Sequence, residues 1–254
     1  MLEILHADEA IVAINKPSGL LVHRSGLATD RVTCMTLLRD QLGRWVYPIH
    51  RLDRGASGVL LFALDPETAS SLGAAFAGRS VRKGYVAIVR GWAPERADVD
   101  YPLDDEEQEG SARVAASTTF RRLETAELPV AIGRYATARY SLVAAEPHTG
   151  RRHQIRRHLA HLRHPIIGDA VHGDGRHNRF FREELGIARL LLHGARLELE
   201  HPRESTTVVL RAPLTMELAE LFARLGWPTD TLGFDDSDSS SATVSNTNTS
   251  GPER

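Results

Sequence analysis

Short apolar stretches, separated by glycine, proline or charged residues, run through most of the chain. Stretches of this kind that are rich in β-branched side chains predict β-strands, and longer stretches with alternating apolar and polar positions predict extended structure as well. On this basis we expect strands at residues 10–14, 46–49, 58–64, 85–90, 112–123, 137–145, 190–200 and 206–211.

Other segments have helical spacing. Asp65 is a good helix N-cap and Pro66 suits the first helical position, so a helix should start there and end near Gly78. Leucines recur with helical spacing from Leu214 to Leu225, where a glycine and a proline then stop the pattern. Strands outnumber helices and often follow one another directly. The chain is therefore predicted to be α+β, with a largely antiparallel mixed sheet flanked by helices and loops.

The pattern also divides the chain into two parts. Residues 1–228 alternate between strand-like and helix-like segments. This pattern predicts a single domain that is large enough to bury an apolar core. Residues 229–254 consist mainly of Ser, Thr, Asn and Asp, with few apolar side chains to offset the entropy of ordering. We therefore predict a disordered polar and acidic C-terminal tail.

Composition indicates a soluble cytoplasmic protein. The chain of 254 residues is 42% hydrophobic and 25% charged, as in ordinary globular proteins. Its single cysteine, Cys34, cannot form an internal disulfide, which suits a reducing compartment. The first residues are too charged for a secretory signal, and the longest apolar run, residues 59–64, is too short to cross a bilayer. We expect no contact with a membrane.

The charge distribution points toward nucleic acid. The formal net charge is −2, but residues 1–229 alone carry +2, because the tail is acidic. Residues 148–203 hold 11 arginines and 9 histidines against 6 acidic residues. Such a local basic field is typical of a nucleic-acid-binding surface. The alternative is a preference for arginine over lysine, since the chain has only two lysines.

Residues 50–58 read HRLDRGASG and lie between two predicted strands. Here Asp53 stands between Arg51 and Arg54 on a short turn. Adjacent cations favour the charged form of a carboxylate. This arrangement suits a reactive carboxylate beside an anionic polymer better than it suits a core. A solvated turn with fortuitous charges is the alternative.

Residues 148–158 read HTGRRHQIRRH and form a second charged group. Helical spacing starts after Gly150, with Ile155 and Leu159 on one face and arginines on a neighbouring stripe. A helix start surrounded by guanidinium groups can bind phosphate or carboxylate. The nearby histidines lack a cysteine or carboxylate at ligand spacing, so we expect no metal site.

These segments and three others resemble the RluA-type pseudouridine synthases. The blocks occur in that family's order over about residues 1–215 and are NKPSGLLVH (15–23), HRLD with SG (50–58), RKGY (82–85), TGRRHQIRRH (149–158) and PIIGD (165–169). Within the family, residues 2–5, 21–25, 165–169 and 172–179 are most similar to the branch that acts on uridine 65 of tRNA. Gly55 and Ala56 replace a more usual Pro-Thr, outside the reacting groups.

The resemblance implies the pseudouridine synthase fold and an isomerase that turns a specific uridine of RNA into pseudouridine. This reaction needs no metal, redox cofactor or phosphate donor, and the chain has no P-loop, dinucleotide fingerprint or zinc spacing. We expect no cofactor. The expected partner is RNA, with tRNA favoured over ribosomal RNA, and the expected state is a monomer without an obligatory protein partner.

The resemblance also assigns roles. Asp53 is the expected nucleophile or stabiliser of the sugar cation. Arg156 is its expected ion-pair partner, with Arg151 as the alternative. Tyr85 is expected to stack on the uracil, and Leu192 to close the apolar wall of the pocket unless it is a plain core leucine. The target must be flipped out of its helix, and Arg51 is the candidate to fill the vacated space.

The sequence also leaves two other classes of function open. A non-catalytic RNA-binding module would use the arginines but would not need Asp53, Tyr85 and Arg156 together. A hydrolase using Asp53 with His50 would need a second carboxylate or a metal.

Overall fold

The computed structural model describes residues 1–24, 32–104, 111–229, 232 and 234. Within these residues the strands form one sheet. They are β1 (Glu3–Ala7), β2 (Ile11–Lys16), β3 (Tyr47–Pro48), β4 (Ser57–Ala63), β5 (Arg82–Arg90), β6 (Arg96–Asp100), β7 (Ser117–Leu128), β8 (Ala138–Pro147), β9 (Leu192–Glu200) and β10 (Thr207–Arg211).

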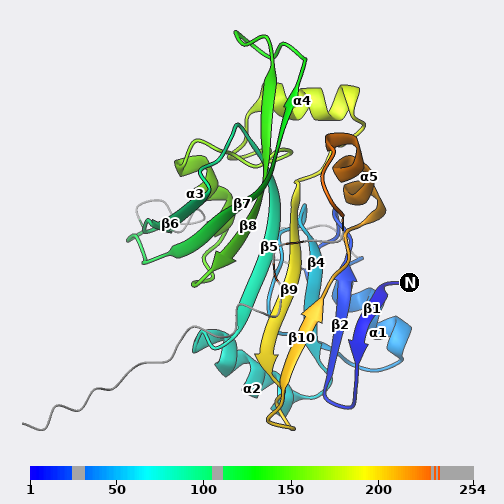
Figure 1. Ribbon diagram of the computed structural model, residues 1–254. Coiled ribbons are helices and arrows are strands. Elements are labelled where there is room, and N and C mark those ends of the chain that lie inside the picture. The colour runs from blue at the N-terminus through cyan, green and yellow to red at the C-terminus, as the bar shows by residue number, and fades with distance from the viewer. Residues whose placement is uncertain (25–31, 105–110, 230–231, 233, 235–254) are drawn as a thin grey trace, which may run out of the picture.

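The strand order is β1-β2-β4-β9-β5-β8-β7-β6, with β3 paired to β4 and β10 paired to β9. Figure 1 shows β5 near the middle of this sheet, between the strands of the N-terminal part and the β6–β8 group. The strand pairs are antiparallel apart from β4 with β9, which run parallel over two residue pairs. The predicted α+β class with a largely antiparallel mixed sheet is confirmed.

Both faces of β2 and β4 are buried, which explains their nearly continuous apolar runs. Alternate side chains of a strand point to opposite faces. Ile11 and Leu61 belong to a core cluster that includes Leu72, whereas Ile14 and Leu60 belong to another that includes Leu38. A third and larger cluster lies along β5, β8 and β9 and includes side chains from three helical segments, residues 154–161, 175–184 and 216–225.

Five helices lie within the described residues: α1 (Cys34–Leu42), α2 (Pro66–Ala77), α3 (Gln154–His161), α4 (Gly175–Glu184) and α5 (Met216–Leu225). The start of α2 is as predicted, since the Asp65 side chain accepts from the backbone N–H of Thr68 and Pro66 follows it. The leucine-rich helix is α5, which ends at Gly226 in the left-handed conformation.

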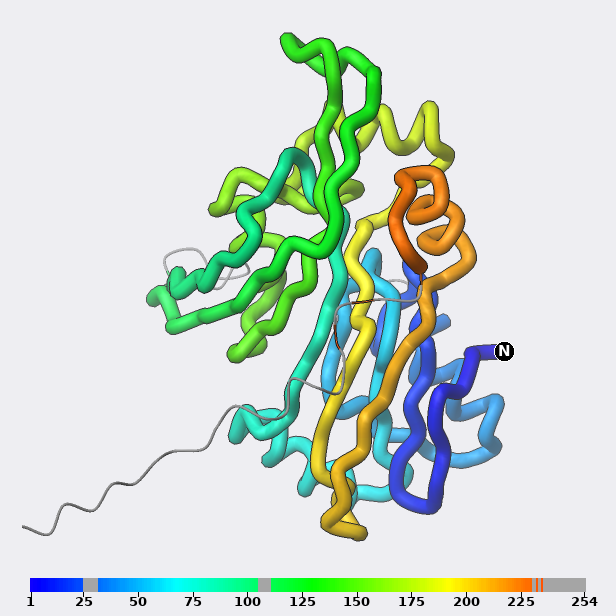
Figure 2. Tube along the Cα trace, viewed as in Figure 1, coloured from blue at the N-terminus to red at the C-terminus, as the bar shows by residue number. Residues whose placement is uncertain are grey.

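One difference from the predicted strands is β7. It begins at Ser117 and continues to Leu128, five residues beyond the predicted end at residue 123. The extra residues include two glutamates and an alanine, which have low strand propensity. They are extended because they pair with the start of β8, as in Glu127 with Arg139. In Figure 2 this β7–β8 hairpin, in green, reaches beyond the rest of the sheet.

Most of the predicted disordered tail, residues 229–254, lies outside the described residues. Of its apolar residues, Leu232 and Phe234 are described, and both pack against the largest core cluster. The Arg211 guanidinium donates to the Phe234 carbonyl at 3.0 Å. Among the described helices, none is long and apolar enough to cross a membrane.

Candidate active site

The loop that carries Asp53 connects β3 to β4 and is fixed by backbone contacts with residues 16–20. The buried ammonium of Lys16 donates to the carbonyls of Pro17, Leu20 and Arg54 at 2.8, 2.7 and 3.3 Å. Gly19 and Arg54 exchange two further bonds, from the Gly19 N–H to the Arg54 carbonyl and from Arg54 Nε to the Gly19 carbonyl. Burial lowers the pKa of Lys16 to about 8, and the three carbonyls hold the buried cation in place.

The other end of the loop is fixed where β4 meets β9. Gly58 has φ +114°, and a Cβ there would lie 2.1 Å from the carbonyl oxygen of Gly194, so only glycine permits this approach. Next to it, the buried Ser57 hydroxyl lies 2.8 Å from His193 Nδ1 and accepts from Arg189 Nη2 at 2.6 Å. Burial lowers the pKa of His193 to about 4, so the imidazole is neutral and its Nδ1 can accept a hydrogen bond from the Ser57 hydroxyl.

His50 precedes Asp53 in this loop, and its ring contacts β4 and α2. Its Nε2 accepts from the backbone N–H of Leu61 at 3.1 Å, and its ring stacks on Phe76 at a centroid distance of 5.0 Å. Burial, followed by the charge of Lys83, lowers the pKa of His50 to about 4. The imidazole is therefore a neutral structural group.

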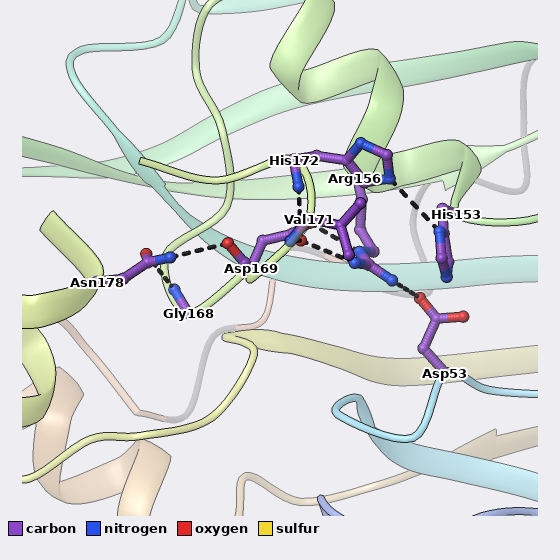
Figure 3. Close-up of polar contacts among 8 residues, drawn as sticks. All are labelled: Asp53, His153, Arg156, Gly168, Asp169, Val171, His172 and Asn178. Carbon is purple, nitrogen blue, oxygen red and sulfur yellow. Dashed lines mark hydrogen bonds and ion pairs between the residues drawn. The ribbon is translucent and has the colours of Figure 1, made fainter. Parts of the chain in front are cut away.

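Arg156 of α3 lies between two carboxylates (Figure 3). Its Nη1 donates to Asp53 at 2.9 Å, while its Nε and Nη2 donate to the two oxygens of Asp169 at 2.7 Å each. The Asp169 side chain is fully buried and that of Asp53 is 21% exposed. Arg156, and not Arg151, is therefore the arginine that pairs with Asp53. The bidentate bond to Asp169 fixes the plane of the guanidinium.

The loop that carries Asp169 is itself fixed by α4. Asn178 accepts from the Gly168 N–H at 2.8 Å and donates to the Asp169 carbonyl at 2.8 Å. One oxygen of Asp169 also accepts from the N–H groups of Val171 and His172. Although burial opposes its charged form, the bonds to Arg156 and to these N–H groups lower the pKa of Asp169 below its ordinary value.

The charged form of Arg156 is likewise stabilised by its surroundings. Burial acts to lower its pKa, but Asp169 and then Asp53 outweigh that effect and raise the pKa above its ordinary value. The site thus contains a permanent cation whose Nη1 points at Asp53.

The predicted site residues lie together around one cleft of about 600 Å³. Its lining includes Arg51, Asp53, Tyr85, Arg156 and Leu192. Tyr85 lies on β5 and is partly buried, Leu192 begins β9 and is 5% exposed, and Arg51 is exposed. Burial, and then the charge of Asp53, raises the pKa of Tyr85, which keeps its hydroxyl protonated.

The start of α3 positions the arginines on the other side of the cleft. Gln154 accepts from Thr149 Oγ1 at 2.6 Å and from the N–H of Arg151 at 3.0 Å, and donates to the Ser117 carbonyl. This closes the turn before the helix. Arg151 and Arg152 line the cleft as a result.

The histidines of α3 and of the residues that follow it contact protein groups other than carboxylates. His158 is buried between the Thr118 hydroxyl and the Tyr101 carbonyl, His161 stacks on Tyr101, and His164 lies 2.9 Å from the Arg90 carbonyl. Across the described ranges, no three His, Cys, Asp or Glu side chains gather in a way that could hold a metal ion.

Asp169 belongs to the PIIGD block of the family resemblance, but the sequence alone gave it no role. We expect Asp169→Asn to lower the free energy of unfolding by about 2–4 kcal/mol, because an amide nitrogen would face the buried Arg156. Urea unfolding with an unchanged m-value would measure this loss.

The pH dependence gives a second measurement. Because the folded pKa of Asp169 lies below 3.8, its ionised form stabilises the fold above that pH, and this stabilisation is lost as the pH falls through the folded value. The stability difference between wild type and Asp169→Asn should therefore shrink in acid. A difference that stayed constant would mean that the charge of Asp169 contributes nothing.

Known proteins share this fold and sequence. Residues 10–161 match the model of the RNA pseudouridylate synthase family. "tRNA pseudouridine synthase C" of Vibrio cholerae is 48% identical over 237 residues, which cover 89% of this chain and 97% of the relative. The protein of the same name from Salmonella typhi is 48% identical, over 89% of this chain and 91% of its own. Human RNA pseudouridylate synthase domain containing 4 has a solved structure with a TM-score of 0.67 and 26% identity, covering 88% of this chain and 93% of that one.

The fold is that of a pseudouridine synthase. The chain belongs to the RNA pseudouridylate synthase family, as its resemblance to the RluA type predicted, and it is an RNA-modifying isomerase.

Proposed function

We propose that this protein converts uridine 65 of tRNA into pseudouridine, with Asp53 as the catalytic carboxylate. The observation that carries the proposal is the ion pair of Asp53 with Arg156, at 2.9 Å, in a cleft also lined by Tyr85 and Leu192. In the reaction the C1′–N1 bond of uridine breaks, the uracil rotates, and a C1′–C5 bond forms. The C5 proton leaves and N1 gains a proton, so no external reactant is consumed.

Asp53 has the geometry for a nucleophile or for stabilising a sugar cation. Its loop is held at both ends, and one carboxylate oxygen accepts from Arg156. The other oxygen points away from Arg156 in Figure 3, and Asp53 lines the cleft. A preorganised carboxylate that needs no rearrangement is what covalent or electrostatic catalysis requires.

Tyr85 and Leu192 form the wall against which the uracil would lie. An aromatic face and an apolar side chain can hold a flipped base without restricting its rotation. The raised pKa of Tyr85 keeps its phenol neutral, so it acts as a stacking surface and a hydrogen-bond donor. Proton removal from C5 would need a separate acceptor. Asp53 lines the same cleft as Tyr85 and is the candidate to accept this proton.

Arg51 has a different task. It is exposed and lines the cleft, two residues before Asp53. Flipping leaves a gap in the base stack at a cost of roughly a few kcal/mol. We assign Arg51 to fill that gap.

The two other classes of function fit the site less well. A hydrolase using Asp53 with His50 would need a free imidazole, but His50 Nε2 accepts from the Leu61 N–H. A non-catalytic RNA-binding module would have no use for a carboxylate paired with Arg156 beside Tyr85.

The choice of tRNA rests on the relatives. Two proteins named tRNA pseudouridine synthase C share 48% identity with 89% of this chain. Arginines of residues 148–203 would bind the RNA backbone, and loops such as residues 172–174 would select the site. We expect the protein to work as a monomer in the cytoplasm.

Mapping pseudouridines in RNA from a strain that lacks this protein tests the substrate. We expect one tRNA position, uridine 65, to lose its pseudouridine, and the purified protein to restore it to that RNA in vitro. Loss of a ribosomal RNA site with every tRNA site retained would show that the target is ribosomal.

A further inference from the structure

One wall of the cleft carries two cations that have no part in the proposed catalysis. Arg79 follows α2, and Lys83 lies at the start of β5, two residues before Tyr85. Both line the same cleft as Asp53. Arg151 and Arg152 line the cleft from the turn before α3.

The Lys83 ammonium contacts the turn before α3, which carries Arg151 and Arg152. It donates to the Thr149 carbonyl at 3.2 Å, and it lies 3.9 Å from where a Cβ of Gly150 would be. Within the described part of the chain, no carboxylate forms an ion pair with Lys83 or Arg79. Burial, followed by the charge of Arg79, lowers the pKa of Lys83. Two cations therefore face the same space without a protein anion to balance them.

The neighbouring imidazole of His50 adds no charge to this part of the cleft. His50 is neutral, with a pKa of about 4, and the charge of Lys83 contributes to that shift. The uncompensated positive charge thus remains available to an anion that enters the cleft.

The backbone of Arg79 gives an independent sign that its side chain matters. Arg79 has φ +61°, a left-handed conformation that is unfavourable for a residue with a Cβ. It closes the C-terminus of α2 through a bond from its N–H to the Phe76 carbonyl. Glycine is the residue usually preferred at such a position. An arginine there is unfavourable for the fold and places a guanidinium at the cleft.

We propose that Arg79 and Lys83 bind one phosphate of the RNA strand that carries the target uridine, next to the flipped nucleotide. Lys83 and Tyr85 are two residues apart on β5, so their Cα atoms are about 7 Å apart. A phosphate on Lys83 therefore belongs to the nucleotide stacked on Tyr85 or to its neighbour. The phosphate supplies the anion that this wall lacks and holds the strand while the base turns. The inference rests on the proposed function, since it names RNA as the ligand.

Affinity and its salt dependence test the site. Removing one phosphate contact lowers the slope of log K against log salt concentration by about 0.7–0.9. We expect Lys83→Gln and Arg79→Gln each to weaken tRNA binding about 10-fold, with a smaller change in the single-turnover rate. Lys83→Arg keeps the charge and should retain affinity within about 3-fold of wild type. Because both cations bind the same phosphate, the double variant should lose no more than about one unit of slope.

Arg79→Gly separates binding from folding. Glycine suits the left-handed backbone, so the variant should have a higher Tm than wild type while it binds tRNA more weakly. A purely structural role for Arg79 predicts unchanged affinity.

Arg82→Gln is the matched control. Arg82 is adjacent to Lys83 but is 65% exposed, pairs with Glu198 at 3.5 Å, and lines a different pocket. Its affinity and salt slope should match wild type. A wild-type salt slope for both Arg79→Gly and Lys83→Gln would overturn the proposal.

The two proposals fail in different ways. If the wild-type protein forms no pseudouridine in any RNA, yet its tRNA affinity still depends on Arg79 and Lys83, the proposed function is wrong and the phosphate site stands. If wild type is active and these variants bind normally, only the phosphate site is wrong.

Discussion

Asp53→Asn should fold as wild type does and form no detectable pseudouridine. Asparagine has nearly the same shape as aspartate, but it lacks the charge that pairs with Arg156 at 2.9 Å. It can neither attack the sugar nor stabilise a sugar cation. The expected effect is larger than for any other substitution in the cleft, because this one removes the reacting group itself.

Among the described residues that line the cleft, no other side chain is a carboxylate that could replace Asp53. The carboxylate of Asp169 also bonds to Arg156, but its side chain is fully buried and its oxygens are occupied by Arg156, Val171 and His172. It cannot reach a substrate in the cleft.

Product formation should be measured under single-turnover conditions with excess enzyme, so that slow residual chemistry is visible. The control is the Tm together with tRNA affinity, and both should stay near wild type because Arg156 keeps its two bonds to Asp169. A correctly folded Asp53→Asn protein that still made substantial pseudouridine would rule out Asp53 as the catalytic group.

The sequence predicted the parts of this site that lie in local motifs. The turn around Asp53, the start of α3 and the family resemblance together named Arg51, Asp53, Tyr85, Arg156 and Leu192, and all five line the cleft. Their chemical roles stay predictions. The α+β class followed from local patterns too, because strand and helix periodicities differ within a few residues.

Contacts between distant segments were not predictable in the same way. Ser57 and His193 pair in the parallel β4–β9 contact although 136 residues separate them. The close approach of Gly58 to Gly194 is visible only when both strands are placed. Lys16 likewise looks like an ordinary charged residue in the sequence, and its burial among three carbonyls depends on two loops meeting.

Two helices, α1 and α4, were not among the predicted elements. In α4 the only fully buried side chain is Phe181, and most of its other residues are charged or polar. The helix α1 begins after Thr33, whose side chain accepts from the N–H of Thr36. These two residues form a capping box in which Thr36 takes the place of the usual Glu or Gln. The helix α1 is short, with Cys34, Leu38 and Leu42 as its apolar stripe, and α4 is stabilised mainly by tertiary packing.

Arg156→Ala should slow the chemical step by raising its activation free energy by about 2–4 kcal/mol. This is the range expected for losing one preorganised electrostatic contact. Arg156 donates to Asp53 and is held in its plane by Asp169, so its loss leaves Asp53 without its partner. The affinity for tRNA should change less, because the guanidinium is buried between two carboxylates and is not free to bind a phosphate.

The same substitution leaves Asp169 buried without its partner, which will also destabilise the fold, by about 3–5 kcal/mol. Arg156→Ala with Asp169→Ala removes both charges and should recover part of the Tm without recovering the rate. Arg151→Ala is the matched control, since Arg151 lines the cleft but does not bond to Asp53, and it should lower affinity more than rate. If Arg156→Ala lost tRNA affinity while its single-turnover rate held, Arg156 would be a phosphate contact and Asp53 would have to keep its position without an ion pair.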